Sequence, residues 1–373
     1  MNLTIAQPSV THLLAPAEFG GLESVVGLLA RGQHQAGSDV TVAGVFLGGS
    51  TDTPFWRAIE ESGARAIPLV VHGNGRRAER RGVREILSGT GCQVLHTHGY
   101  RPDILDAPVA RRLGVATVTT VHGFTGGGPK MWAYEWLQRR AFRSFDAVVA
   151  VSAKLSGQLV SSGVPRDRVH TVRNAWDSTS PILSRSAARE LLGIEGGYPV
   201  VGWVGRMSSE KAPDLMIRAF GGLEDPRVRL SMVGDGPMRE QLEGLGGPES
   251  RNARVRWHGV VPEAGKYLRA FDVIAITSWT EGTPIVLLEA MAAGVPIVTT
   301  RVGGIPDVVS SREAILVEPG DEAGIRDALK GVLAGEAVVG ERASAATRRL
   351  EESFGVGPWI ERYRKIYASC LAG

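Results

Sequence analysis

Two cations at the predicted start of a helix form the clearest candidate binding site in the sequence. Arg206 and Lys211 lie five residues apart, directly after the β-rich run 199–204. The N-terminus of a helix offers free N–H groups and the positive end of its dipole, so two added cations would make a strong diphosphate site. The chain has 6 lysines against 36 arginines, so Lys211 is not merely a habitual surface cation. The alternative is a structural ion pair of Lys211 with Glu210 or Asp214.

Two carboxylates follow a later β-rich run, 272–277. Glu281 lies in the predicted loop after this run, and Glu289 lies eight residues further on, in a predicted amphipathic helix. Because carboxylates accept hydrogen bonds from vicinal hydroxyls, Glu281 suits a sugar and Glu289 suits a ribose. A capping or helix-dipole role is the alternative for Glu289.

Glycine turns follow other β-rich runs of the chain. Gly234 opens a tight turn, Gly303 and Gly304 open another, and Gly21 begins a predicted helix after the first strand. In open parallel α/β sheets, ligands bind beyond the carboxyl ends of the strands. We therefore expect these turns to offer backbone N–H groups to an anion.

Histidines also lie at predicted strand ends. His122 follows the run 115–121, where it could hydrogen-bond to a hydroxyl or phosphate oxygen, and a structural histidine is the alternative. His96 and His98 share one face of a strand and could bind a metal together. No third ligand follows them at suitable spacing, so we expect no metal site. Motifs for a serine nucleophile, a Walker loop and a full dinucleotide-binding turn are absent, which disfavours ATP hydrolysis and hydride transfer.

Short β-rich runs alternate with helical patterns along the chain, which predicts βαβ units and parallel sheets. We expect one domain over 1–176 and a second over 198–354, with the Ser-, Pro- and Gly-containing segment 177–197 as the linker. The tail 355–373 carries apolar residues at helical spacing and could pack back onto the first domain. The predicted strands are 3–6, 39–46, 66–71, 93–96, 115–121, 146–151 and 168–172, then 199–204, 228–233, 254–258, 272–277, 296–299 and 313–317.

The composition is that of a globular protein in a reducing compartment. Hydrophobic residues make up 43% and charged residues 22%, and the 2 cysteines cannot form a disulfide framework. No stretch is long and apolar enough to span a bilayer, and the N-terminus lacks the basic start of a signal peptide. We expect a cytoplasmic protein.

The charge is unevenly spread along the chain. Residues 1–176 carry a net charge of +6 and the remainder carries −3. A solvated surface helix is the simplest interpretation of the basic cluster, and attraction to anionic lipid at the inner face of the membrane is the sharper one. Nucleic acid is disfavoured because no aromatic residues interleave with the cations. The cluster consists of Arg76, Arg77, Arg80, Arg81 and Arg84.

These motifs, in this order, resemble the retaining glycosyltransferases of family four, which have the GT-B fold: two Rossmann-like domains that face each other across a cleft. The matching segments are Gly20 to Glu23, His122-Gly123, Val149 to Ser152, Val172 to Asn174, Val204 to Arg206 with Lys211, Gly234 to Pro237, Glu281 to Glu289, and Gly303 to Asp307. They span nearly the whole chain.

The resemblance implies that the C-terminal domain binds a nucleotide-diphosphate sugar and that the N-terminal domain binds the acceptor. Arg206 and Lys211 would hold the diphosphate, and Glu289 would hold the ribose. The resemblance places the remaining residues as follows: Glu281 with the backbone of Gly282 and Thr283 at the hexose, Gly234 and Pro284 in the donor site, His122 over the sugar, and Gly21 near the phosphates.

The resulting hypothesis is transfer of a hexosyl unit, from a UDP-sugar in preference to a GDP-sugar, with retention of configuration and without a metal or other cofactor. The expected acceptor is a carbohydrate or a lipid-linked molecule, as in cell-surface polysaccharide or glycolipid synthesis. Three alternatives stay open: a nucleotide-sugar epimerase of the same fold, a transferase that acts on a small soluble acceptor in secondary metabolism, and a non-catalytic sugar-nucleotide-binding protein.

Overall fold

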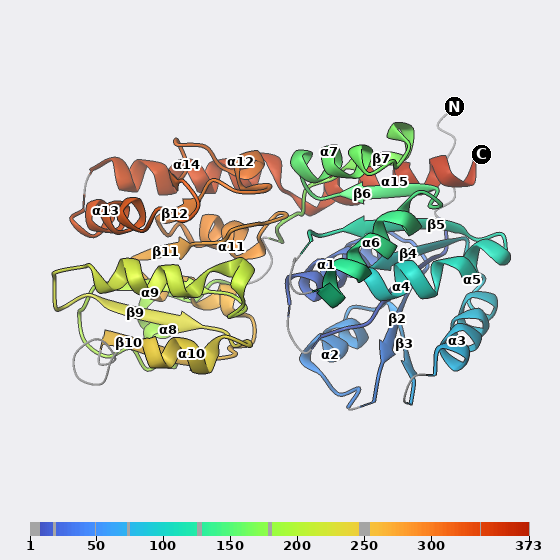
Figure 1. The fold of residues 1–373 in the computed structure, drawn as a ribbon, viewed down its shortest axis with the longest axis horizontal. Coiled ribbons are helices and arrows are strands. Elements are labelled where there is room, and N and C mark those ends of the chain that lie inside the picture. Colours follow the sequence, from blue (N-terminus) through green and yellow to red (C-terminus); the bar gives the residue numbers. More distant parts are fainter. Residues whose placement is uncertain are drawn as a thin grey trace. The chain divides into compact units, whose positions relative to one another are not determined.

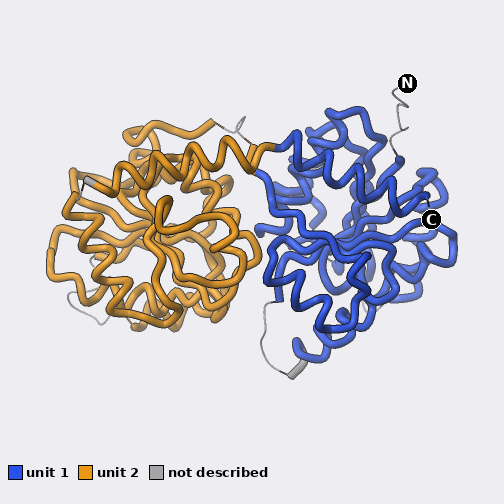
Figure 2. Tube along the Cα trace, turned by 90° about the horizontal axis from the view of Figure 1, so that it is seen from above, with its two compact units in different colours: residues 1–175, 356–373 blue, residues 176–355 orange. Residues whose placement is uncertain are grey.

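The computed structural model divides the chain into two compact units, one of residues 1–175 with 356–373 and one of residues 176–355 (Figure 2). Each unit is built on one parallel sheet with helices on both faces (Figure 1). The structure describes residues 8–17, 20–48, 50–72, 75–124, 129–177, 181–245, 254–335 and 337–372.

The sheet of the first unit has its seven described strands in the order β3-β2-β1-β4-β5-β6-β7. The strand order reverses beside β1, so β1 and β4 flank the switch point at which ligands bind in such sheets. The strands are β1 (Val10–Leu14), β2 (Val40–Phe46), β3 (Arg65–Val70), β4 (Val94–His98), β5 (Ala116–Val121), β6 (Ala147–Ala150) and β7 (Val169–Thr171). The helices between them are α1 (Gly21–Gln35), α2 (Pro54–Glu61), α3 (Arg76–Gly89), α4 (Tyr100–Leu105), α5 (Ala107–Arg112), α6 (Pro129–Phe142), α7 (Ala153–Ser161) and the 3₁₀ turn η1 (Arg166–Arg168).

The central strands of this sheet are apolar and β-branched because helices cover both of their faces. On one face, Leu14 and Val42 pack with Val26 of α1. On the other face, Leu13 and Val45 pack with residues of α3 and α5. The last helix, α15 (Val356–Leu371), packs against α1 and β5, so the tail forms the expected helix and completes the first unit.

The six described strands of the second unit have the order β10-β9-β8-β11-β12-β13, and the switch point lies between β8 and β11. The strands are β8 (Val200–Val204), β9 (Arg229–Val233), β10 (Val255–Gly259), β11 (Val273–Ile276), β12 (Ile297–Thr300) and β13 (Ile315–Val317). The helices are α8 (Arg185–Leu191), η2 (Ser209–Lys211), α9 (Pro213–Gly221), α10 (Arg239–Leu245), η5 (Ala264–Ala270), α11 (Ile285–Ala293), α12 (Ile305–Val308), α13 (Glu322–Leu333) and α14 (Ala337–Ser353).

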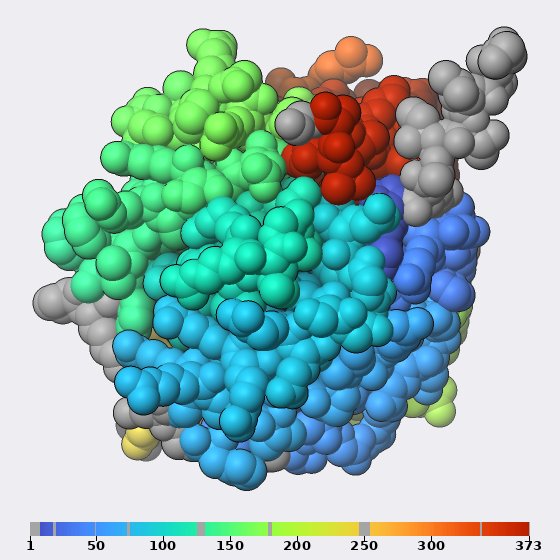
Figure 3. Space-filling model, turned by 90° about the vertical axis from the view of Figure 1, so that its right-hand side faces the viewer, coloured from blue at the N-terminus to red at the C-terminus, as the bar shows by residue number. Residues whose placement is uncertain are grey.

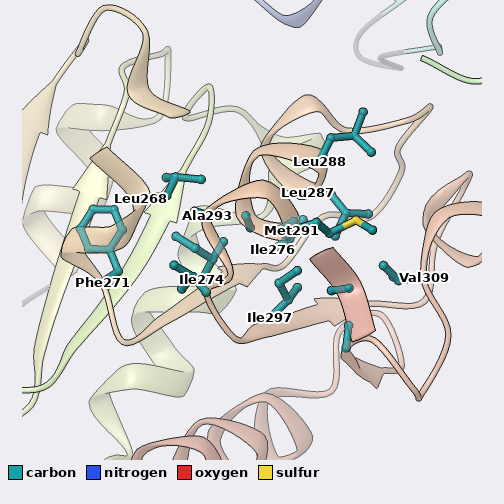
Figure 4. Close-up of a cluster of buried hydrophobic side chains, with 14 of the residues drawn as sticks. Leu268, Phe271, Ile274, Ile276, Leu287, Leu288, Met291, Ala293, Ile297 and Val309 are labelled. Carbon is teal, nitrogen blue, oxygen red and sulfur yellow. The ribbon is translucent and has the colours of Figure 1, made fainter. Parts of the chain in front are cut away.

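Two apolar clusters hold the second unit together, one on each face of its sheet. Figure 4 shows the cluster beneath α11, where Leu287 and Met291 lie among side chains of β11 and β12. The opposite cluster joins α9 and α13 to β8 and β9. Packing on both faces fixes the strands, and therefore fixes the loops that leave their carboxyl ends.

The alternation of strands and helices predicted from the sequence is confirmed in the described residues, with one strand that was not predicted and one helix within the predicted linker. The predicted strand 3–6 lies outside the described residues, and the first described strand is Val10–Leu14. The predicted linker 177–197 is not only a connection, because α8 lies within it and buries Ala188 and Leu192 in the second unit's core. Its Ser and Gly content resembles a linker because Ser184 caps the helix and Gly193 follows its end.

Candidate functional site

The turn after β8 carries Arg206 and leads into η2, which ends at Lys211. Arg206 is exposed, and its side chain has no ion-pair partner among the described residues. Lys211 Nζ donates to both carboxylate oxygens of Glu281, each at 2.7 Å, so its partner is neither Glu210 nor Asp214. The structure therefore brings two of the predicted site residues, Lys211 and Glu281, into direct contact.

Hydrogen bonds from neighbouring strands hold the Lys211 backbone in place. The hydroxyl of Thr277, at the end of β11, donates to the carbonyls of Lys211 and Ala212 at 3.1 and 2.9 Å. The indole N–H of Trp203 in β8 donates to the same Thr277 hydroxyl at 3.1 Å. Both strands at the switch point thus fix the position from which Lys211 reaches Glu281.

Glu281 lies in the loop between β11 and α11, as predicted. Its side chain is 6% exposed, and it accepts a second hydrogen bond from the Ser278 hydroxyl at 2.6 Å. Gly282 and Thr283 follow it in the loop, Pro284 precedes the first turn of α11, and all three are buried. The Glu281 carboxylate is therefore held by a cation and a hydroxyl of the chain itself.

Two glycine turns pack directly against this site. Gly303 has a φ of +55°, and a Cβ at this position would overlap the carbonyl oxygen of Glu281. Gly234 has a φ of +123°, and a Cβ there would overlap the carbonyl oxygen of Gly205, beside Arg206. Both positions need glycine because a side chain is excluded by the left-handed backbone and by the neighbouring loop. The predicted turns therefore shape the loops that carry Arg206 and Glu281.

Glu289 lies in the second turn of α11, where its carboxyl group packs against Gly265 of η5. This burial raises the pKa of Glu289 to about 7. Among the described residues, Glu289 forms no ion pair, whereas Glu281 is paired with Lys211, so the two predicted carboxylates lie in different surroundings. The Glu281 carboxylate faces a cation, and the Glu289 carboxyl is desolvated by burial.

His122 follows β5 in the first unit and lies at the end of a chain of buried histidines. Its Nε2 is 3.4 Å from Nδ1 of His98, and Nε2 of His98 is 3.1 Å from Nδ1 of His12. Burial lowers the pKa of His12 and of His122 to about 4, and it lowers the pKa of His96 and His98 well below the ordinary value. These imidazoles are therefore neutral at pH 7.

No third ligand follows His96 and His98 at suitable spacing in the sequence, but the fold brings His12 beside them. His12 pairs in register with His96 across the parallel strands β1 and β4, and nitrogens of the three residues approach within 4.8 Å of one another. Each ring nitrogen of the three residues already has a protein partner. The cluster is thus a complete hydrogen-bond network, and the absence of a metal site stays a prediction.

Gly21 is the first residue of α1, as the sequence suggested. The carboxyl group of the nearby Glu23 folds back over Gly20 and accepts a hydrogen bond from the N–H of Ala17 at 2.8 Å. Burial raises the pKa of this carboxyl group. The start of α1 is therefore partly occupied by the chain's own carboxyl group, which the sequence did not reveal.

The basic cluster lies on α3, on a face of the first unit seen in Figure 3. All five arginines are exposed. Arg80 also donates to the carbonyl of Leu105 at 3.1 Å, so one of the five has a structural contact. No helix within the described ranges has both the length and the apolar character needed to span a membrane.

Comparison with known proteins adds two matching family models. Residues 19–179 match the model of glycosyltransferase family 4, and residues 198–335 match the model of group 1 glycosyl transferases. Among curated proteins, the chain is 30% identical to a D-inositol 3-phosphate glycosyltransferase of Xylanimonas cellulosilytica, over 74% of this chain and 71% of that protein. It is 27% identical to an N-acetyl-alpha-D-glucosaminyl L-malate synthase of Bacillus anthracis, over 77% of each chain.

Solved structures show the same fold at lower identity. HepE from Anabaena in complex with UDP-glucose superposes with a TM-score of 0.84 at 18% identity, over 96% of this chain and 99% of that one. Sucrose-phosphate synthase from Thermosynechococcus elongatus gives a TM-score of 0.79 at 18% identity, over 97% and 99% of the two chains. Together with the two parallel-sheet units, these likenesses show the GT-B fold.

Proposed function

The chain belongs to the glycosyltransferases of family 4, which act with nucleotide sugars, and we propose that it transfers a hexosyl unit from a UDP-sugar with retention of configuration. The observation that carries the proposal is the corner of the second unit where Arg206, Lys211 and Glu281 meet the switch point of the sheet. The complex of HepE with UDP-glucose supports the choice of uridine.

The charges at this corner suit the leaving group of the reaction. Breaking a glycosyl phosphate bond leaves negative charge on the diphosphate and positive character on the sugar ring. In the proposal, Arg206 and Lys211 stabilise the departing diphosphate, and the bonds that already hold Lys211 limit its reorganisation during the reaction. The acceptor hydroxyl attacks the anomeric carbon on the same face of the sugar ring from which the diphosphate departs. An oxygen of the leaving diphosphate takes the acceptor's proton.

The two glutamates take different roles in this proposal. Glu281 accepts hydrogen bonds from the hexose hydroxyls, with the backbone of Gly282 and Thr283 beside it. Its bonds to Lys211 and Ser278 support a binding role over that of a nucleophile, because they stabilise the charged carboxylate and lower its reactivity. Glu289 accepts hydrogen bonds from the ribose, which would replace the water that its burial excludes.

The acceptor is proposed to carry negative charge. Residues 1–176 have a net charge of +6, and the arginines of α3 are exposed. A lipid-linked acceptor at an anionic membrane surface satisfies this chemistry. A small soluble acceptor is the second candidate, because the two curated relatives are named for transfer to D-inositol 3-phosphate and for an L-malate product.

Substitution of the two cations tests the donor site. Arg206→Ala and Lys211→Ala should each lower the transfer rate about 100-fold, which corresponds to ~3 kcal/mol of transition-state stabilisation. Arg227→Ala is the matched control, since Arg227 is exposed and pairs with Asp225 before the start of β9. Wild-type rates in both test variants would contradict the diphosphate site.

Incubation with the donor alone separates the remaining alternatives. A transferase should hydrolyse a UDP-sugar slowly, whereas an epimerase of the same fold should convert it to a new sugar epimer. Donor binding without transfer to any acceptor, across lipid-linked, carbohydrate and small anionic candidates, would indicate a non-catalytic binding protein.

A further inference from the structure

Two segments at the switch point of the second unit, η2 and the loop that follows β11, are bound to each other residue by residue. The backbone N–H of Trp279 donates to the carbonyl of Glu210 at 2.8 Å, and the Thr277 hydroxyl donates to the carbonyl of Lys211 at 3.1 Å. The carboxylate of Glu281 accepts from the Lys211 amine. Alternate residues of the loop after β11 therefore hold consecutive residues of η2.

Ala212, the residue after η2, has a left-handed backbone with a φ of +47° and a ψ of +53°. It is one of two non-glycine residues with a positive φ in the described part of the chain. The right-handed helical region is disfavoured for it because Pro213 follows and begins α9. A left-handed backbone is unfavourable for a residue with a Cβ, so the surroundings must hold it. The Thr277 hydroxyl contributes to this hold, since it also donates to the carbonyl of Ala212 at 2.9 Å.

Trp203 fixes the direction of the Thr277 hydroxyl. An indole N–H can only donate, and a carbonyl can only accept. The Thr277 oxygen therefore accepts from Trp203 at 3.1 Å, and its single proton goes to the carbonyls of Lys211 and Ala212, which share it. Thr277 is 1% exposed and Trp203 is 2% exposed, so water does not compete with these bonds.

The amine of Lys211 has one N–H more than its ion pair uses. An ammonium group carries three N–H donors, and the Lys211 amine bonds to the two oxygens of Glu281, each at 2.7 Å. No further partner of this amine occurs among the residues that the structure describes, and the Lys211 side chain is 29% exposed. The remaining N–H can therefore bind a ligand oxygen while the bonds to Glu281 stay in place.

We propose that Thr277, oriented by Trp203, positions Lys211 so that the remaining N–H of its amine binds a diphosphate oxygen while Glu281 keeps its two bonds. This inference rests on the proposed function and deepens it. Thr277 is a positioning residue, because it acts through the Lys211 backbone. One lysine then serves both parts of the donor, the diphosphate directly and the sugar through Glu281. The Thr277 hydroxyl should therefore matter for binding of the diphosphate and not for binding of the nucleoside.

Binding of UDP and of uridine to the full-length protein tests this separation. Thr277→Val keeps the shape of the side chain and removes the hydroxyl. In NMR titrations, the substitution should weaken UDP binding about tenfold, and uridine binding should stay within about twofold of wild type. UDP affinity equal to that of wild type would overturn the proposal. Equal weakening of both ligands would also overturn it, because that result indicates a general distortion of the second unit.

Two further substitutions identify the hydroxyl as the cause. Thr277→Ser restores the hydroxyl, so UDP affinity should return to within about twofold of the wild-type value. Thr299→Val is the matched control, since Thr299 is equally buried in the neighbouring strand β12 and its hydroxyl donates to the carbonyl of Thr300, at 3.4 Å, rather than to η2. This control should bind UDP like wild type. A full loss of affinity in Thr277→Ser, or the same loss in Thr299→Val, would contradict a specific role of the Thr277 hydroxyl.

A double-mutant cycle with Lys211→Met tests whether Thr277 acts through Lys211. If it does, Thr277→Val should weaken UDP binding no further in the Lys211→Met background, and a further loss of about tenfold there would overturn the proposal. Trp203→Phe, which removes the indole N–H, provides the same comparison if Thr277→Val does not fold, with an expected loss of about threefold. Failure of the wild-type protein to bind UDP would contradict the proposed function together with this inference. UDP binding that depends on Lys211 but not on Thr277 would contradict this inference alone.

Discussion

The two sheets end in opposite kinds of polar environment at their switch points. In the first unit, the ends of β1 and β4 carry buried, neutral imidazoles whose nitrogens bond to one another and to an amide. In the second unit, the ends of β8 and β11 carry an exposed arginine and a lysine–glutamate pair, shaped by glycine turns. The first arrangement suits uncharged hydroxyl groups, and the second suits an anion.

The comparison shows that the same sheet architecture can provide two chemical environments. The burial or exposure of the side chains at the strand ends decides which one forms. The histidines of the first unit are neutral because α1 and α15 bury them, and burial disfavours the charged form. In the second unit, the turn after β8 leaves Arg206 exposed to solvent, and its side chain has no ion-pair partner in the part of the chain that the structure describes. The predictions that follow test this contrast.

The largest expected effect is on the glycine turn beside Glu281. Gly303→Ala should lower the free energy of unfolding by about 3 kcal/mol, because the left-handed backbone is strained and the new Cβ overlaps the Glu281 carbonyl. Denaturant unfolding measures the loss, and nucleotide binding should weaken with it. Gly340→Ala in α14 is the control, since no atom lies within 4 Å of its Cβ and the change should stabilise the helix slightly. Equal stability of the two variants would contradict the packing of this turn.

Substitution of the two cations should change the stability of the protein by different amounts, although both cations share a proposed role in binding. Lys211→Met leaves Glu281 with only its Ser278 bond and should cost about 2 kcal/mol of unfolding free energy. Arg206→Met should change the unfolding free energy by less than about 0.5 kcal/mol, because its side chain is exposed. Both variants should bind UDP more weakly in calorimetry. UDP binding of wild-type strength in both variants would contradict an anion site at Arg206 and Lys211.

The buried carboxyl of α11 should give the second unit a distinct pH dependence. The pKa of Glu289 is about 7 in the folded chain and near its ordinary value of 4.5 in the unfolded chain. Between these values the folded chain keeps a proton that the unfolded chain has lost. The stability that the neutral carboxyl contributes is therefore fully present below pH 4.5 and is lost as the pH rises to 7.

Glu289→Gln should remove this loss. Relative to wild type, the variant should gain about 2 to 3 kcal/mol of unfolding free energy between pH 4.5 and 7.5. Denaturant titrations of both proteins across this range provide the measurement. Parallel stability curves would show that Glu289 ionises normally in the folded protein.

The smallest expected effect on the fold concerns the basic face of α3. Changing Arg76, Arg77, Arg81 and Arg84 to Gln should reduce sedimentation with anionic liposomes and leave unfolding unchanged, because Arg80 keeps its bond to Leu105. Neutral liposomes serve as the control, and little protein should sediment with them. Equal recovery of both proteins with both kinds of liposome would leave α3 as an ordinary solvated helix.

Much of the second unit's site could be predicted from local sequence. Arg206, Gly234, Glu281 and Gly303 each follow a strand directly, and parallel strands bring their carboxyl ends to one edge. The pairing of Lys211 with Glu281 could not be predicted, because nearer carboxylates at Glu210 and Asp214 offered equally plausible partners. The folded positions of β8 and β11 decided between them.

The hydrogen-bond network of the first unit was much harder to predict from the sequence. His96 and His98 were visible as alternate residues of a strand, but His12 lies 84 residues before His96, and only the register of β1 with β4 joins them. Gln33 and Tyr367 are 334 residues apart and have no motif in common. The predicted linker failed for a related reason, because a short capped helix and a connection share the same Ser and Gly content.

The sequence by itself determined the alternation of strands and helices, the glycine turns at strand ends and the family of the chain, because these depend on periodicity and on residues close together along it. Only the tertiary structure decided which carboxylate holds Lys211, which carboxyl is desolvated and which histidines share one hydrogen-bond network. Those properties arise from contacts between distant segments, whose energies depend on burial and on the exact geometry of a few hydrogen bonds.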